Sequence, residues 1–161
     1  KKKGGLMMPD LKKGDIIYSV QHDMIIGYSH YGVYIGGGKV IHFASNPNDG
    51  NEKNIHITSL EKFQGDGDKI CVRYIPSSKK ALAIILKNRN MDAGFIASIM
   101  TDYDISGYHC YSSEETVRRA KSQLGMSQYS LMFNNCEHFG IWCKTGLKES
   151  SQMIRLLCDL F

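Results

Sequence analysis

The sequence predicts an α+β protein with one domain, and two observations lead to the α+β class. Runs rich in β-branched and aromatic residues fill the first half of the chain, and helical patterns with capping residues fill the second half. The chain has 161 residues, only three prolines and no repeat or low-complexity tract. This length suits one domain with its own core. We therefore expect a single domain over residues 1–161, with a core at about 10–148 and a C-terminal helix at 150–160.

Five short runs have the composition of strands. The runs at 29–35 and 39–44 flank three glycines at 36–38, which is typical of a hairpin. Turn-forming residues at 46–54 and at 64–68 separate the later runs. In chain order, the predicted strands are DIIYSV, SHYGVYI, KVIHFA, NIHITSL and KICVRYI.

Helical patterns follow the strands. The run ALAIILKN at 81–88 fits a helix or a buried strand, and we favour a helix. In the stretch 112–125, Ser113 precedes acidic residues, basic residues come later and Gly125 closes the pattern, so both helix ends are marked. A further helix is expected from about Asn135 to Lys144, where Gly146 stops it.

Composition limits the kind of partner. The formal net charge is only +4 and no basic stripe alternates with aromatic residues, so we expect no nucleic-acid binding. Five cysteines without a CxxC pair, and no apolar segment after the first lysines, predict a reduced cytoplasmic protein without a signal peptide. The run MIRLLCDLF is too short to span a bilayer. Membrane contact would then be peripheral, with the initial KKK as one route to an anionic surface.

The stretch FNNCEHFGIWCKTG, at 133–146, contains a cysteine whose chemistry depends on its place in a helix. At about 100° per residue, Glu137 and His138 lie roughly 100° and 200° around the axis from Cys136, so the three do not form a local triad. A helix N-terminus instead offers unpaired N–H groups, which should lower the thiol pKa and hold an oxyanion. The alternative is that Cys136 is a buried apolar residue.

A thiolate nucleophile needs a base from elsewhere in the fold, and the predicted hairpin carries two histidines. If residues 36–38 form a three-residue loop, His42 lies opposite Gly32, diagonal to His30 and on the same face. A two-residue loop would put the histidines on opposite faces. Gly32 would leave that face open for a substrate or for the incoming helix. The remaining histidines have weaker contexts: His22, His56, His109 and His138.

Two motifs together, HYGVYIGGGKVIHF and NNCEHF, resemble the H-box and NC motifs of the lecithin:retinol acyltransferase-like family. The likeness runs from about Leu11 through both motifs to Gly146, with a less specific middle. It implies a circularly permuted papain-like (NlpC-like) fold, in which an antiparallel sheet carrying the histidines packs on a helix carrying the cysteine. It also implies that Cys136 is the nucleophile, His30 the general base and His42 the histidine that orients or polarises it. Asn134 and Asn135 fall beside the cysteine and would cap the helix.

The resemblance further implies thiol-dependent acyl transfer or hydrolysis on phospholipid esters, of the phospholipase A/acyltransferase type, through a cysteine acyl-thioester. The expected substrate is a glycerophospholipid or another acyl ester, and no cofactor or metal is expected. Two alternatives stay open: a cysteine peptidase or amidase with the same geometry, and a non-enzymatic H-box/NC interaction module. A zinc site from Cys136, His138, Cys143 or the hairpin histidines is disfavoured. Cys136 and Cys143 lie two turns apart on one helix, and the sequence has no CxxC pair.

Overall fold

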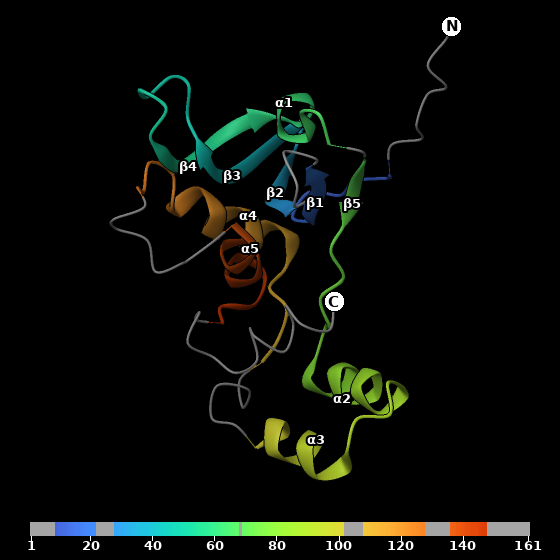
Figure 1. Ribbon diagram of the computed structural model, residues 1–161. Helices are drawn as coiled ribbons and strands as arrows, with labels where there is room; N and C mark the ends of the chain where they lie inside the picture. Colours follow the sequence, from blue (N-terminus) through green and yellow to red (C-terminus); the bar gives the residue numbers. More distant parts are fainter. Residues whose placement is uncertain (1–8, 22–27, 68, 102–107, 128–135, 148–161) are drawn as a thin grey trace, which may run out of the picture.

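The computed structural model describes residues 9–21, 28–67, 69–101, 108–127 and 136–147 (Figure 1). Within these ranges, five strands form one antiparallel sheet in the order β4-β3-β2-β1-β5, so the α+β class is confirmed. The strands are β1 (Ile16–Gln21), β2 (Tyr28–Gly36), β3 (Lys39–Ser45), β4 (Lys53–Ser59) and β5 (Ile70–Val72). The helices are α1 (Leu60–Gln64), α2 (Lys79–Asn88), α3 (Ala93–Met100), α4 (Ser113–Ser122) and α5 (Cys136–Thr145).

The β2–β3 hairpin has the predicted histidine register but a different loop. Gly32 pairs with His42, as a three-residue loop would require. Nearer the turn, however, Gly36 pairs with Lys39 and leaves only two glycines, at positive φ, in the loop. A β-bulge at Ile35 supplies the extra residue that restores the register. The prediction that a two-residue loop would separate the histidines is therefore wrong for this hairpin.

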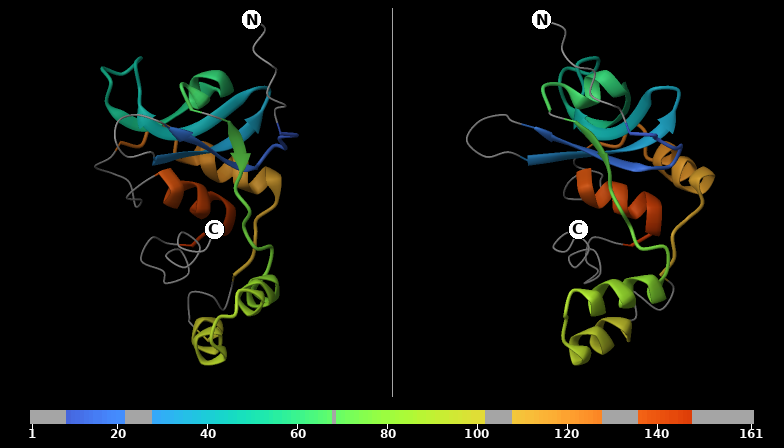
Figure 2. Two further views of the ribbon diagram at one scale, coloured as in Figure 1. Left: turned by 45° about the vertical axis from the view of Figure 1, so that its right-hand side comes forward. Right: turned by 90° about the vertical axis from the view of Figure 1, so that its right-hand side faces the viewer.

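One face of the sheet is covered by α1, which the sequence did not predict. The strand prediction ran through Leu60, but the Ser59 side chain accepts a hydrogen bond from Lys62 N at 3.1 Å and begins a helix there. Phe63 of this helix packs with Ile17, Val40 and Ile70 of the sheet. Figure 2 shows α1 on one side of the sheet, with α4 and α5 on the other.

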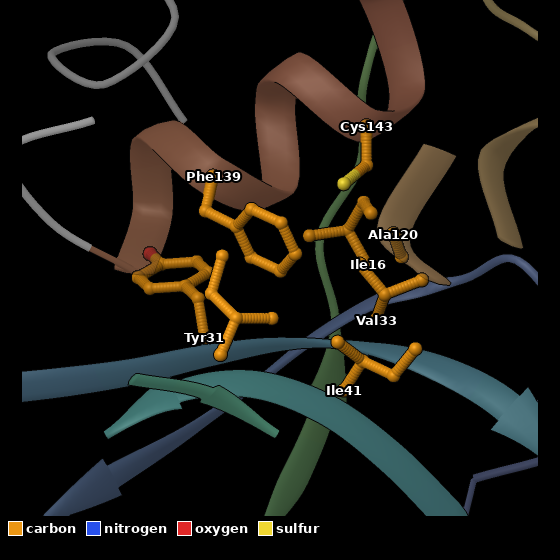
Figure 3. Packing of buried hydrophobic residues seen from close by; sticks show 8 residues of the cluster. Ile16, Tyr31, Val33, Ile41, Ala120, Phe139 and Cys143 are labelled. Carbon is orange, nitrogen blue, oxygen red and sulfur yellow. The ribbon is translucent and has the colours of Figure 1, made fainter. Parts of the chain in front are cut away.

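The opposite face carries the main core, which lies between the sheet and the helices α4 and α5. Phe139 and Cys143 of α5 point towards the strands, and Ala120 of α4 lies beside them (Figure 3). Gly140 brings α5 close to β1, since a Cβ there would lie 2.9 Å from Ile16 Cγ2. The buried members of this core are Ile16, Tyr31, Val33, Ile41, Ile55, Ala120, Phe139 and Cys143.

A second, smaller core joins α2 and α3 to the other side of α5. Leu82 and Leu86 of α2 are fully buried, in one cluster with Ile99 of α3 and Ile141 of α5. The helix favoured at 81–88 is thus confirmed as α2, and α3 follows it. In consequence α5 is held from two sides, by the sheet and by the α2–α3 pair.

Two helix ends differ from their prediction by small amounts. The N-cap of α4 is Ser112 rather than Ser113, because the Ser112 hydroxyl accepts the Glu115 N–H at 3.2 Å. The helix α5 ends at Thr145, one residue after the predicted Lys144, and Gly146 follows with a φ of 74°. Its predicted start at about Asn135 lies outside the described residues. The helix predicted at 150–160 lies outside the described residues, as do Asn134, Asn135 and the initial KKK.

None of the helices in the described ranges has the length and apolar character that crossing a bilayer demands.

Candidate active site

Adjacent strands bring His30 and His42 into direct contact. The two side chains lie on the α1 face of the sheet, where both rings pack against Phe63, with centroids 5.0 Å and 5.7 Å from its own. His30 Nε2 and His42 Nδ1 are 2.7 Å apart, which is a short hydrogen bond. The predicted diagonal arrangement of the two histidines is confirmed.

The space at Gly32 has a different use from the one predicted. A Cβ at this position would lie 2.5 Å from Val40 Cγ1 and 2.9 Å from Phe63 Cε2. The face beside the histidines is therefore filled by Val40 and by α1, rather than open to a substrate or to the cysteine helix. Gly32 is required for close packing.

A third histidine, which the sequence did not single out, continues the contact. His56 of β4 pairs directly with His42 of β3, and their Nε2 atoms are 3.0 Å apart. The spacing between the two residues is even, but the turn at 46–52 is too long to fix a strand register from sequence. This turn explains why the sequence did not reveal the pairing.

Beyond His56, the contacts end on asparagine and aspartate side chains. His56 Nδ1 lies 3.1 Å from Asn54 O and 3.0 Å from Asn54 Oδ1. The Asn54 Nδ2 group donates to Asp49 Oδ2 at 2.8 Å, and Asn46 Nδ2 donates to Asn54 Oδ1 at 3.2 Å. Asn54 is buried, whereas His56 is half-buried and lines a cavity of about 290 Å³ together with Lys39 and Lys62.

Cys136 approaches the sheet where β2 and β3 stop pairing. The pairing of these two strands ends at Gly32 and His42. Tyr34 exchanges backbone hydrogen bonds with the segment that leads into β1. Successive residues of a strand point their N–H groups to opposite sides, so Tyr31, three residues before Tyr34, points its N–H group to the side of β3. There the Tyr31 N–H donates to Cys136 Sγ at 3.5 Å. The thiol thus lies against the residue that follows His30.

Burial keeps both hairpin histidines neutral. Loss of hydration, helped by the charge of His56, lowers the pKa of His30 to about 4. Loss of hydration, followed by the charges of His30 and His56, lowers the pKa of His42 to about 3. A neutral ring keeps a nitrogen lone pair, which a general base requires.

The pKa of the Cys136 thiol is raised, because its burial outweighs other effects. Hydrogen bonds from the backbone N–H groups of Tyr31, Cys136 and Glu137 act in the opposite direction. The backbone N–H groups at the start of the helix therefore lower the thiol pKa, as expected, but burial raises it by more. The prediction of a lowered thiol pKa is wrong. The Cys136 thiol and the rings of His30 and His42 are therefore all uncharged in this structure.

A buried ion pair fixes the start of α5 against the sheet. The side chain of Arg73 is 4% exposed, and its Nη2 atom lies 3.0 Å from Glu137 Oε1. Its Nη1 atom donates to Tyr31 Oη at 3.0 Å. Glu137 follows the nucleophile candidate, so this bridge joins the residue after β5, the strand β2 and the first turn of α5. The sequence placed Arg73 in a strand but did not indicate this role.

The other candidate groups are less connected to this centre. His109 packs on the Tyr111 ring at 4.7 Å, and His22, like Asn134 and Asn135, lies outside the described residues. Within the ranges that the structure describes, no three His, Cys, Asp or Glu side chains are grouped so as to hold a metal ion.

Known proteins resemble this chain over most of its length, including the segments that carry the candidate site. A family model described as lecithin retinol acyltransferase matches residues 9–149. The lecithin retinol acyltransferase of Rattus norvegicus is 30% identical over 134 residues, which are 78% of this chain and 52% of that protein. The human protein of the same name is 27% identical over 132 residues, which are 77% of this chain and 52% of that protein.

A plant relative shows a similar likeness. Protein LEAD-SENSITIVE 1 of Arabidopsis thaliana is 27% identical over 155 residues, which are 85% of this chain and 58% of that protein. The chain thus spans about half the length of the relatives that it matches.

Proposed function

The chain belongs to the lecithin retinol acyltransferase family, and on this premise we propose that it cleaves or transfers acyl groups of phospholipid esters through a thioester on Cys136. One observation carries the proposal. His30 and His42 are joined at 2.7 Å, and the Cys136 sulfur lies 3.5 Å from the N–H of the residue after His30. A thiol and a supported histidine are the parts that nucleophilic catalysis needs.

In the first step, His30 acts as the general base. Its Nε2 atom is engaged with His42, so Nδ1 is the nitrogen that accepts the thiol proton. The sulfur attacks the ester carbonyl carbon, and a tetrahedral oxyanion forms. The first backbone N–H groups of α5 have no partner within the helix and are suited to hold this oxyanion. His30 then returns the proton to the leaving alcohol oxygen, and the acyl-thioester remains on Cys136.

In the second step, an acceptor attacks the thioester. Water gives a free fatty acid, whereas an alcohol or an amine gives an O-acyl or N-acyl product. His30 takes the proton of the acceptor and gives it to the departing sulfur. The names of the mammalian relatives contain a phospholipid donor, lecithin, and an alcohol acceptor, retinol. For this chain we propose a glycerophospholipid donor.

The pKa shifts favour proton transfer during attack over a preformed ion pair. The pKa of Cys136 is raised and the pKa of His30 is lowered to about 4, so the resting site holds a neutral thiol and a neutral imidazole. His42 then supports His30 by hydrogen bonding and orientation. We also propose that the histidine strands and the later cysteine helix correspond to a permuted papain-like arrangement.

Intact mass spectrometry tests the proposal. The protein is incubated with a short-chain phosphatidylcholine, and the expected result is a mass increase of one acyl group that is absent in Cys136→Ala. The matched control is Cys110→Ser, whose hydroxyl can replace the thiol that donates to Pro76 O. This variant should be acylated like the wild type.

Two results would contradict the proposal. Folded protein that gives neither adduct nor fatty acid, in short-chain lipid and in vesicles, would favour the interaction module. Release of amine from peptide or amide substrates, with no action on lipid, would favour the cysteine peptidase or amidase.

A further inference from the structure

His30, His42 and His56 are joined in a row by two hydrogen bonds between ring nitrogens. The contacts at the His56 end determine which nitrogen donates in each bond. A contact between two ring nitrogens needs one N–H group and one lone pair. At the outer end, His56 Nδ1 faces the backbone oxygen of Asn54 at 3.1 Å, and this oxygen can only accept. His56 Nδ1 must therefore carry the hydrogen.

The orientation of the Asn54 amide agrees with this assignment. Its Nδ2 group donates to Asp49 Oδ2 at 2.8 Å, and a carboxylate can only accept. The amide oxygen Oδ1 is thereby turned to His56 Nδ1, at 3.0 Å. Two acceptors, one of them in the main chain, face the same ring nitrogen.

The position of the hydrogen on His56 then determines its position on His42, and His42 determines it on His30. A neutral His56 with its hydrogen on Nδ1 has a lone pair on Nε2, so His42 Nε2 donates across the 3.0 Å contact. The Nδ1 atom of His42 consequently has the lone pair, and His30 Nε2 donates to it across 2.7 Å. The hydrogen of His30 is on Nε2, and its Nδ1 atom has the lone pair.

We propose that His56, held by Asn54, is a positioning residue that fixes the tautomer of His30 in which Nδ1 is the basic nitrogen. The catalytic consequence rests on the function proposed above, since Nδ1 is the atom that takes the thiol proton. His42 and Asn54 are 7% and 5% exposed, so water has little access to replace a lost partner.

Without His56, a hydrogen on the buried Nε2 atom of His42 has no acceptor, so the reverse direction of hydrogen bonding is favoured. His42 then carries its hydrogen on Nδ1 and donates to His30 Nε2, and the hydrogen of His30 must move to Nδ1. The base nitrogen is then blocked. A histidine with the wrong tautomer is the reason for a loss of about 10⁴-fold in the serine protease triad. In that triad the aspartate contacts the base directly, whereas His56 contacts the base through His42. We expect the loss of His56 to reduce the rate of reaction at Cys136 at least about tenfold.

The direct test is an NMR spectrum of the imidazole ¹⁵N nuclei, recorded at about pH 8, above the ordinary histidine pKa of about 6.5. The His30 signals are assigned by comparison with His30→Gln. We expect Nε2 to be protonated and Nδ1 to be unprotonated. A hydrogen on Nδ1 of His30 in the wild type would overturn the proposal, whatever the lipid assay shows.

Variants of His56 provide a second readout that needs no lipid. The rate of Cys136 alkylation by iodoacetamide is measured at one pH for His56→Ala and His56→Gln. The glutamine oxygen can accept from His42 Nε2, so His56→Gln should keep the wild-type tautomer and most of the rate. His56→Ala should show hydrogen on His30 Nδ1 and at least tenfold slower alkylation.

The matched control is Thr58→Ala, since Thr58 is the next residue of β4 on the same face and lines the same cavity. It should alkylate at the wild-type rate. Equal rates in His56→Ala and wild type, or equal losses in the two His56 variants, would overturn the positioning role. A correct His30 tautomer in a protein that does not process phospholipid would instead reject the proposed function alone.

Discussion

Gly32 is the residue at which the space around the histidines is most restricted. Substitution by alanine would place a methyl group 2.5 Å from Val40 Cγ1 and 2.9 Å from Phe63 Cε2. Phe63 contacts both histidine rings, so any shift of its ring changes their packing. We expect Gly32→Ala to lower the free energy of unfolding by about 1–3 kcal/mol and to slow acylation of Cys136, as measured by urea unfolding and intact mass.

A double variant separates this steric effect from a loss of backbone freedom. Val40→Ala removes the nearer atom of the overlap, so the cost of Gly32→Ala should be smaller in the Val40→Ala background than alone. Additive costs would show that overlap with Val40 is not the cause.

The neutral histidines should make the protein less stable in acid. The pKa of His30 is about 4 in the folded protein, below the ordinary value of about 6.5. The unfolded chain then binds more protons below about pH 6.5, so the free energy of unfolding falls as pH falls from 6.5 towards 4. At pH 5 the loss from His30 alone is about 2 kcal/mol.

Urea unfolding between pH 7.5 and pH 5 measures this effect, with His30→Gln as the comparison. The variant has no titrating ring at this position and should lose less stability over the same interval. A parallel pH dependence in the two proteins would argue against a lowered pKa of His30.

Among the elements, α5 depends on the ion pair that fixes its first turn. Glu137→Ala leaves the Arg73 guanidinium, 4% exposed, without its carboxylate. We expect a loss of about 3 kcal/mol in the free energy of unfolding, together with slower alkylation of Cys136, because the helix start is no longer held near Tyr31.

A matched double variant tests whether the lost charge pairing causes this effect. Replacing both members, in Glu137→Leu with Arg73→Met, removes the unpaired charge and should recover part of the stability. If the double variant is as unstable as the sum of its single variants, the two side chains act independently.

The same elements show what could be predicted from sequence. The contact of His30 with His42 was predicted from a three-residue loop, but the structure reaches the same register with a two-residue loop and a bulge at Ile35, which the sequence did not indicate. The contact of His42 with His56 could not be predicted, since the seven-residue turn between their strands leaves the register undetermined. Helix α1 was missed because it has only five residues, and such a segment shows no helical period.

Long-range effects on the site were also beyond prediction. The sequence indicates a helix N-terminus at Cys136, which by itself favours a thiolate. The packing that buries the thiol and reverses the net pKa shift comes from distant segments. Arg73 likewise meets Glu137 only through tertiary structure.

In the whole molecule, the two cores meet at α5. Phe139 and Cys143 face the sheet, and Ile141 faces the α2–α3 pair. Leu86→Ala in α2 should create a cavity and cost about 2–5 kcal/mol. We expect faster amide hydrogen exchange in α5 as well, although the substitution lies on another helix.

The control for this coupling is Ile84→Ala, on the same helix but 52% exposed. It should leave the exchange of α5 unchanged. Equal exchange in Leu86→Ala and wild type would show that the smaller core does not support the nucleophile helix.

The hydrogen bond from Tyr31 N to Cys136 Sγ has one more consequence. The donor belongs to the main chain, and every amino acid except proline provides it. Mutation of the tyrosine side chain therefore cannot abolish the donor that holds the sulfur. This part of the site depends on the path of the backbone and not on the identity of residue 31. It therefore tolerates changes in sequence that would remove a side-chain ligand.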